Sequence, residues 1–391
     1  MDHQPATARR KVSEEQRLST ESPGPTSAGT RELIDCAKTP MTKSKIDCIM
    51  LKPLVSVIIN NYNYERFVGE AISSALRQTY DRMEVIVVDD GSSDDSRAVI
   101  EGYGKEIVSV FKTNEGQASA FNAGFSKSSG QIICLLDADD IFLPNKVEKV
   151  VEAYKNDKTG WCFHPLQWVD IIARPIAGSP DLRYATGNYD FRRQYLRGKP
   201  VFWAAPTSGL TFRRSLLEKL LPMPKHIRIT GDNYLTFTSP AFAPGFYISE
   251  CLSLQRVHGA NAYTANDDGL FKATVQISIA RGLHDSFPEL ARLANRLFAN
   301  ALAAKWTAGA EFKGLWGELR QYLGDCAVSE KIEVLTRMAY RIFRPRRPRV
   351  AASIGPGIRP TPLRDLASES SLCSEEVMST TSEGRIRPKV E

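Results

Sequence analysis

The chain has 391 residues, of which 42% are hydrophobic, and its formal net charge is +6. This length and hydrophobic content suffice for one large or two ordinary domains with a buried core. The charge is small, and no basic stripe interleaved with aromatic residues occurs in the central region, so no nucleic-acid partner is predicted.

Seven cysteines are scattered along the chain without any Cys-x-x-Cys pair, which argues against a disulfide framework or a structural zinc site. The first residues contain no apolar segment of signal-peptide length. Nowhere do roughly 18 apolar residues run together, as a membrane span requires. These features predict a cytoplasmic protein in a reducing compartment.

Composition divides the chain into four segments. Residues 1–52 and 346–391 are polar and poor in aromatic residues, so both are predicted to be disordered tails. Residues 53–265 carry the signals of one domain, with a regularly patterned half over 53–156 and an irregular half over 157–265. Residues 266–345 are predicted to be a mainly helical extension.

Four short runs rich in valine and isoleucine recur in the regular half, and each is predicted to be a strand. They lie at residues 55–59, 84–88, 107–111 and 132–136. Helix-like segments at 65–78, 93–103 and 117–128 separate them. This alternation predicts an α/β fold with a Rossmann-like, doubly wound, mostly parallel sheet.

Polar and acidic residues follow every run, at Asn60–Tyr64, Asp89–Asp95, Lys112–Gln117 and Asp137–Asp140. Ligands of open α/β sheets bind beyond the carboxyl ends of the strands. The sequence has no glycine-rich phosphate-binding motif, and carboxylates attract hard cations. We therefore expect Mg²⁺ or Mn²⁺ at this edge, bridging a nucleoside diphosphate to the protein. Asn60, Tyr62 and Asp90 then offer polar groups and a stacking ring to the nucleoside.

The segments "VSVIINNYNYERFVGEAISSALRQTYDRMEVIVVDDGSSDDS" and "NEGQASAFNAGFSKSSGQIICLLDADDIFLPNKV" resemble the nucleotide-binding half of glycosyltransferase family 2, an inverting family with the GT-A fold. The order and spacing match throughout this half, and the resemblance is looser from Trp161 to Asn261. It implies that residues 53–265 are a GT-A catalytic domain, with a nucleotide-binding half at 53–156 and an acceptor half at 157–265.

The resemblance also implies roles for single residues of the nucleotide-binding half. Asp90 would contact the nucleotide base, and Asn60 and Tyr62 would line the same pocket. Asp137 and Asp139 stand at the positions of the family's Asp-x-Asp motif, with Asp139 as the direct metal ligand. The residues expected near the ribose and diphosphate are Asn114, Gly116 and Asn122.

In the acceptor half, Asp232 resembles the family's acidic motif and is the expected general base, since a carboxylate can take the proton of the attacking hydroxyl. Gly231 stands where the family often has a second acid. Ser208 and Gly209 resemble the loop that faces donor sugar and acceptor.

The segment "QRVHGANAY" resembles the family's Arg-x-His element. Arg256 would then help to stabilise the departing nucleotide diphosphate, and His258 would be a metal ligand.

These features predict an inverting transferase that moves one sugar from a nucleotide-diphospho-sugar, expected to be UDP-linked, to a hydroxyl of a glycan or lipid-linked acceptor. The Gln-x-x-Arg-Trp motif of processive members is absent. The alternatives are an inactive nucleotide-binding scaffold and, ranked lower, an aspartate-based phosphohydrolase. The phosphohydrolase motif ends the first core strand, whereas three predicted strands precede Asp137 here.

Structural interpretations stay open at several positions. Asp137 could brace its loop, Tyr62 could be a packed aromatic, and His258 could be a satisfied structural histidine. Residues 331–350 place apolar residues on one helical face and end in five arginines. That segment is either a packing helix with a solvated tail or a peripheral anchor on anionic lipid at the inner face of the cell membrane.

Overall fold

The computed structural model describes residues 52–177, 184–200, 205–259, 261 and 268–343. The predicted tails, apart from Lys52, lie outside the described residues. From Lys52 onward the described residues belong to one compact unit.

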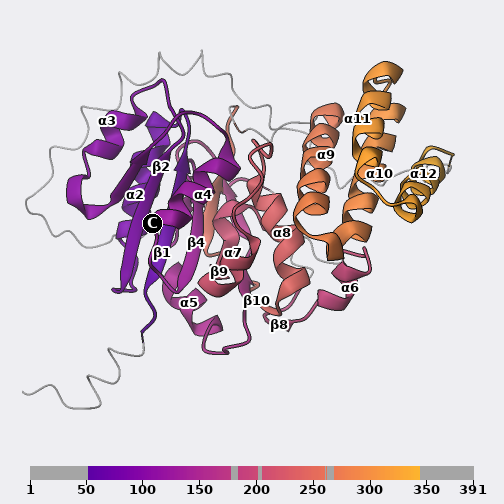
Figure 1. The fold of residues 1–391 in the computed structure, drawn as a ribbon. Coiled ribbons are helices and arrows are strands. Elements are labelled where there is room, and N and C mark those ends of the chain that lie inside the picture. Colours follow the sequence, from indigo (N-terminus) through magenta and orange to yellow (C-terminus); the bar gives the residue numbers. More distant parts are fainter. Residues whose placement is uncertain (1–51, 178–183, 201–204, 260, 262–267, 344–391) are drawn as a thin grey trace, which may run out of the picture. The chain divides into compact units, whose positions relative to one another are not determined.

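In the described part of the chain, eight strands form the main sheet, in the order β3-β2-β1-β4-β9-β6-β10-β8 (Figure 1). Their bounds, in that order, are Val108–Phe111, Met83–Asp89, Val55–Asn61, Ile132–Asp137, Leu210–Arg213, Trp161–Phe163, Gly245–Tyr247 and Gly187–Tyr189. The strands β3, β2, β1 and β4 are the four predicted runs, and they pair in parallel. The predicted α/β fold with a parallel sheet is thus confirmed over this half.

Beyond β4 the sheet becomes mixed. The strand β9 pairs antiparallel with both β4 and β6. Because an antiparallel neighbour begins where β4 ends, the 3-10 turn η2 (Thr207–Gly209), which leads into β9, lies beside the carboxyl end of β4.

Side chains alternate between two cores on the faces of the sheet. Val57 and Ile59 of β1 pack with the helices α2 (Glu65–Leu76), α3 (Ser96–Glu101) and α5 (Lys146–Ala153). Ile58 packs on the other face with α4 (Gln117–Lys127), α7 (Arg214–Leu220) and α8 (Gly231–Phe242). This alternation, with helices on both faces, is what a doubly wound sheet requires. The helices predicted after the first three strands are α2, α3 and α4, and α2 buries the apolar face that its spacing predicts.

A small second sheet has the order β5-β11-β7, with bounds Ile141–Phe142, Ser253–Arg256 and Leu166–Val169. The strand β5 directly follows the Asp137–Asp140 loop, and β11 pairs with it. This pairing carries the residues after β11 to the carboxyl end of β4.

The described part of the chain ends in helices, as predicted for this region. They are α9 (Gly269–Ser286), α10 (Ala291–Thr307), α11 (Phe312–Gly324) and α12 (Val328–Phe343), with short 3-10 turns at Gly104–Glu106 (η1) and Pro288–Leu290 (η3) and a short helix α6 (Arg192–Leu196) earlier. Buried residues of α9 and α10 join those of α8 in one core. The helical segment therefore packs onto the part of the domain that contains α8.

The helix α12 is only partly covered. Val334 is buried, whereas Ile332 and Phe343 expose 61% and 82% of their surface. Residues 344–350, with four of the five arginines of the proposed lipid anchor, lie outside the described residues. Among the helices that the structure describes, none combines the length and apolar character needed to cross a membrane.

Candidate active site

Three carboxylates gather where β4 ends. Oxygen atoms of Asp137, Asp139 and Asp140 lie within 4.8 Å of one another. Burial, with the charge of Asp139 adding to it, raises the pKa of Asp137 to about 8. The same two causes raise the pKa of Asp140 well above its usual range. Buried like charges repel one another, so this cluster favours a bound cation or proton.

Asp139 contacts residues that follow β11. Its Oδ2 lies 3.1 Å from His258 Nε2 and accepts a hydrogen bond of 3.1 Å from Asn261 Nδ2. The His258 ring stacks on Phe67, with centroids 5.0 Å apart, and meets the edge of Tyr64. His258 is therefore held in one orientation beside the predicted metal ligand.

Tyr64 also faces the cluster. Burial raises the pKa of its hydroxyl, and the charges of Asp139, Asp137 and Asp140 raise it further. A phenol among carboxylates stays protonated and can donate a hydrogen bond to them.

Asp140 braces the loop. Its Oδ2 accepts a 2.6 Å hydrogen bond from the Ser208 hydroxyl, and its Oδ1 accepts one of 3.0 Å from the Arg256 backbone N–H. The hydroxyl oxygen of Ser208 also accepts from the Asp137 backbone N–H at 3.1 Å. Both Asp140 oxygens are thus engaged, which leaves Asp137 and Asp139 as the carboxylates better placed to bind a cation.

Arg256 is buried and reaches three different segments. Its Nε donates to the Asp139 carbonyl at 3.0 Å, and its Nη atoms donate to the Ile171 carbonyl and to the Glu70 carboxylate. The guanidinium also lies over the Phe67 ring, 4.8 Å from its centroid. Three of the five guanidinium N–H groups thus hold the Asp139 loop against neighbouring segments.

Asp232 lies in the first turn of α8, and burial raises its pKa to about 6. Its Oδ1 atom is buried without a hydrogen-bond partner among the described residues. The charge of Asp232 contributes to the raised pKa of Asp137, so the two carboxyls lie close enough to interact. Thr230, just before the helix, has φ of 57°, a left-handed conformation that costs a β-branched residue on the order of 1–3 kcal/mol. This strained turn sets the direction of Asp232.

Gln117, at the start of α4, connects the two acidic groups. Its Nε2 donates to Asp137 Oδ1 at 3.3 Å, and its Oε1 accepts from the Gly231 backbone N–H at 2.8 Å. The adjoining Gly116 has φ of 93°, and a Cβ there would lie 2.5 Å from the Arg228 Cα. Only glycine allows these two segments to approach so closely.

Asp90 lies after β2, where the nucleoside is expected. Its Oδ1 accepts from Lys112 Nζ at 2.6 Å and its Oδ2 from the Gly116 backbone N–H at 2.7 Å. Asp90 therefore also fixes the loop between β3 and α4. Tyr62 at the end of β1 is 47% exposed, so its ring is accessible for stacking. Asn60, on β1, lowers the pKa of Asp137 by hydrogen bonding. This hydrogen bond connects the carboxyl end of β1 to the acidic cluster after β4.

Three further predicted residues have structural partners. Asn122 donates to the Met223 carbonyl at 2.9 Å and accepts from the Met223 N–H at 2.8 Å. Asn114 accepts from Arg228 at 2.6 Å. At Gly209 a Cβ would lie 2.3 Å from the His164 carbonyl oxygen. Packing alone explains Asn122 and Gly209.

The family model described as "Glycosyl transferase family 2" matches residues 56–221. An uncharacterized glycosyltransferase of Nostoc sp. (strain PCC 7120) is 36% identical over 216 residues, which cover 53% of this chain and 66% of that protein. A Rickettsia prowazekii relative with the same description is 30% identical over 213 residues, covering 53% of this chain and 65% of that protein. Residues 56–221 of the chain thus match glycosyl transferase family 2, and the family assignment rests on this part of the chain.

This match confirms the family predicted from the sequence. The match to these two relatives spans just under two thirds of their length. The fold is also similar to that of S. aureus TarS, with a TM-score of 0.52, 14% identity, and coverage of 74% of this chain and 54% of that one. The predicted GT-A-type α/β fold with a helical C-terminal region is confirmed.

Several residues of the family 2 site were missed in the sequence. Gln117, Thr207 and Asn261 carry no motif of their own, and each lies next to a predicted residue. The Thr207 side chain lowers the pKa of both Asp137 and Asp232 by hydrogen bonding. Gln117 and Asn261 do lie within the quoted segments, Gln117 at the end of the polar stretch after the third strand and Asn261 after the Arg-x-His element.

Proposed function

We propose that the chain is an inverting, metal-assisted glycosyltransferase that moves one sugar from a nucleotide-diphospho-sugar to an acceptor hydroxyl. One observation carries the proposal: Asp232, with a buried oxygen that has no hydrogen-bond partner among the described residues and a pKa near 6, lies close to Asp137 of the acidic cluster, and Gln117 bonds to both Asp137 and the Gly231 N–H. An acid and a metal-binding cluster that lie close together are what in-line transfer between a hydroxyl and a bound diphosphate sugar needs.

The donor set of the cluster fits Mn²⁺ or Mg²⁺, which prefer carboxylate oxygens and keep open positions for substrate phosphates. Asp139 and Asp137 are the proposed ligands, with His258 beside Asp139 as a further ligand or as the group that orients it. A bound divalent cation would offset negative charge on the departing nucleoside diphosphate.

Asp232 is proposed to take the proton of the attacking hydroxyl. A base with a pKa near 6 is ionised at neutral pH and still accepts a proton effectively. Its unpartnered oxygen leaves one acceptor position for the substrate hydroxyl. Gln117 and Thr207 are proposed to hold the spacing between this base and the cation-binding carboxylates.

The nucleoside is proposed to bind between Tyr62 and Asp90, with Asn60, Asn114 and Gly116 nearby. A stacking ring beside a buried carboxylate suits a base that offers N–H donors, as uracil does, and this supports a UDP-linked donor. The acceptor is proposed to be a hydroxyl of a glycan or a lipid-linked glycan, and peripheral contact with a membrane through residues 331–350 remains part of this proposal.

Calorimetric titration with UDP, GDP and several sugar nucleotides, with and without Mn²⁺, tests the binding part of the proposal. We expect one nucleotide to bind more tightly with Mn²⁺, and Asp139→Asn to remove this metal dependence. Asp157→Asn, on an exposed turn, is the matched control. Binding that does not depend on a divalent cation contradicts the proposed cluster, and metal-dependent binding without turnover on any donor favours an inactive scaffold.

A further inference from the structure

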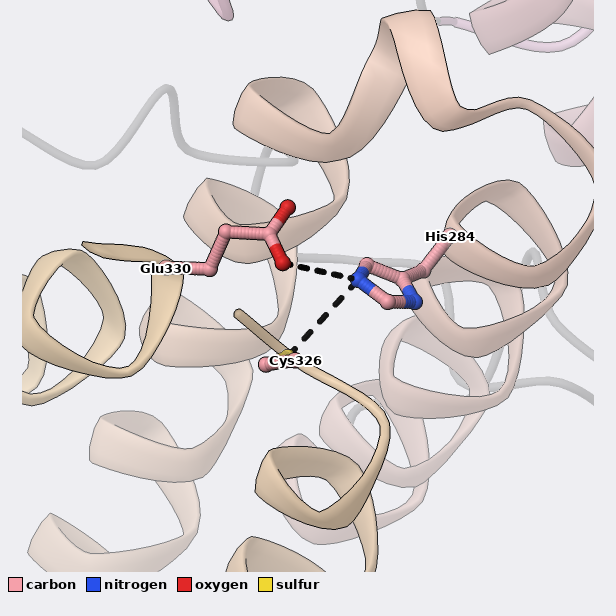
Figure 2. A group of neighbouring side chains, drawn as sticks. All are labelled: His284, Cys326 and Glu330. Atoms are coloured by element: carbon pink, nitrogen blue, oxygen red, sulfur yellow. Dashed lines mark hydrogen bonds and ion pairs between the residues drawn. The ribbon is translucent and has the colours of Figure 1, made fainter. Parts of the chain in front are cut away.

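A second group of metal-binding side chains lies in the C-terminal helices. Figure 2 shows His284, Cys326 and Glu330 pointing toward one another from the last turn of α9, the turn after α11 and the first turn of α12. The His284 Nε2 atom lies 3.7 Å from Cys326 Sγ and 3.6 Å from Glu330 Oε2. One donor atom from each residue lies within 4.8 Å of the other two.

These separations suit a tetrahedral metal ion. Zn²⁺ binds sulfur at about 2.3 Å and nitrogen or oxygen at about 2.0–2.2 Å, so ligand atoms around it lie roughly 3.3–3.6 Å apart. The 3.6 Å separation between His284 Nε2 and Glu330 Oε2 lies at the end of this range, and the 3.7 Å separation between His284 Nε2 and Cys326 Sγ lies just beyond it. We propose that His284, Cys326 and Glu330 bind Zn²⁺.

The chemistry of the donors selects among metals. A thiolate, an imidazole and a carboxylate together match the borderline-soft Zn²⁺, whereas Mg²⁺ and Ca²⁺ prefer oxygen ligands throughout. Binding forms a zinc–sulfur bond as the Cys326 thiol releases its proton to solvent, with no oxidation or reduction.

Neighbouring residues favour a cation at this position. Asp285 Oδ1 lies 3.8 Å from His284 Nδ1, the nitrogen that faces away from the other donors. A carboxylate near the second ring nitrogen of a metal-binding histidine fixes its tautomer and strengthens it as a ligand. The carboxylates of Glu330, Asp325 and Asp285 all lie near the Cys326 thiol, and this surplus of negative charge attracts a cation.

The site leaves room for a fourth ligand. The side chains of His284 and Glu330 are 13% and 23% exposed, so water can reach an ion held between them. Glu330 Oε2 also accepts a 2.9 Å hydrogen bond from the Ala327 N–H. This helix-capping contact orients the carboxylate toward His284 before any metal binds.

The ion would tie the end of α9 to the turn between α11 and α12. His284 and Cys326 are 42 residues apart in the chain, so the site is visible only once the helices have packed. The cysteine spacing predicts no structural zinc site because it contains no Cys-x-x-Cys pair, whereas this site uses a single cysteine. The proposal is independent of glycosyl transfer and concerns the helical extension alone.

Titration of the full chain, purified without metal, with Co²⁺ and then with Zn²⁺ tests the proposal. Cobalt reports a thiolate ligand through a near-ultraviolet charge-transfer band that ions on carboxylates alone lack. We expect wild-type protein to show this band, Zn²⁺ to displace the cobalt, and Zn²⁺ to raise the melting temperature. Absence of the band from wild-type protein overturns the proposal without any variant.

Variants then assign the band. Cys326→Ser should lose one equivalent of thiolate-bound cobalt, whereas Cys251→Ser, which alters another free cysteine, should not. Glu330→Gln is a milder change. Because loss of a residue that only supports a metal ligand already costs about 10-fold in affinity, loss of a ligand should weaken Zn²⁺ binding by at least about 10-fold. Asp139→Asn, which alters the cluster of three aspartates at the end of β4, should leave the band unchanged. An undiminished band in Cys326→Ser overturns the proposal.

Discussion

His258 Nε2 lies 3.1 Å from Asp139 Oδ2, although 119 residues separate them in the chain. The pairing of β11 with β5 brings them together, because β5 begins directly after the acidic loop. Phe67 and Tyr64 then hold the imidazole in place from α2 and its N-terminal end. Three segments far apart in the sequence therefore converge on one carboxylate.

Replacing His258 tests whether it supports the cation. In His258→Ala, Asp139 loses the partner that orients it, so Mn²⁺-dependent nucleotide binding should weaken by about 10–100-fold. Calorimetry at several Mn²⁺ concentrations measures this loss. His226→Ala is the control, since that exposed ring contacts only the Ser278 carbonyl among its described hydrogen bonds. Unchanged metal dependence in His258→Ala contradicts the assignment.

Gln117→Ala should separate the two acidic groups of the site. The Gly231 N–H loses its acceptor, and an unpaired buried N–H costs about 1–3 kcal/mol. A misplaced Asp232 should lower turnover on the order of 10-fold while donor binding changes little. Steady-state kinetics with Gln131→Ala, an exposed glutamine, as control provide the comparison. Equal turnover in Gln117→Ala and the control argues against this bridging role.

Tyr62 is predicted to stack on the nucleotide base. Tyr62→Ala should weaken nucleotide binding by about 1–3 kcal/mol, the usual worth of one stacked base, and Tyr62→Phe should restore it. Tyr340→Ala, which removes another exposed aromatic ring, should have no effect. If the alanine and phenylalanine variants bind nucleotide equally, the ring does not stack.

The charge on Asp232 should lower the stability of the folded protein at neutral pH. Its pKa rises from the ordinary 3.8 to about 6 in the folded state, so the folded protein favours the protonated form. The stability that protonated Asp232 gives the folded state is present in full below pH 4 and is lost as the pH rises through 6. Without divalent cations, Asp232→Asn should therefore be more stable than wild type at pH 7, on the order of 2 kcal/mol, with a smaller difference at lower pH. Urea unfolding across this range checks the trend, and a constant difference contradicts it.

The sequence predicts the parallel half of the sheet well, because each strand there is a short apolar run with its own turn. The runs at 55–59, 84–88, 107–111 and 132–136 all lie within or overlap observed strands. The strand β9 escaped prediction, because "LTFR" is too short to show a period and gains its place only by pairing with β4 and β6. Because β9 lies between β4 and β6, Ser208 just before it comes within hydrogen-bond distance of Asp140.

The position of the acidic cluster is predictable, because Asp137, Asp139 and Asp140 directly follow an apolar run that forms a strand. The partners of Arg256 are not predictable, because they depend on how β11 pairs. Its side chain donates to the Asp139 and Ile171 carbonyls and to the Glu70 carboxylate. Gln117 gains its importance only from the approach of Gly116 to Arg228.

The most direct test of the central claim is the rate of nucleoside diphosphate release from a panel of sugar nucleotides with Mn²⁺, with and without glycan acceptors, for wild type and Asp232→Asn. The proposed mechanism predicts turnover of one donor by wild type, and a loss of about 100- to 10,000-fold in Asp232→Asn with donor binding intact. Turnover by Asp232→Asn at the wild-type rate would contradict it.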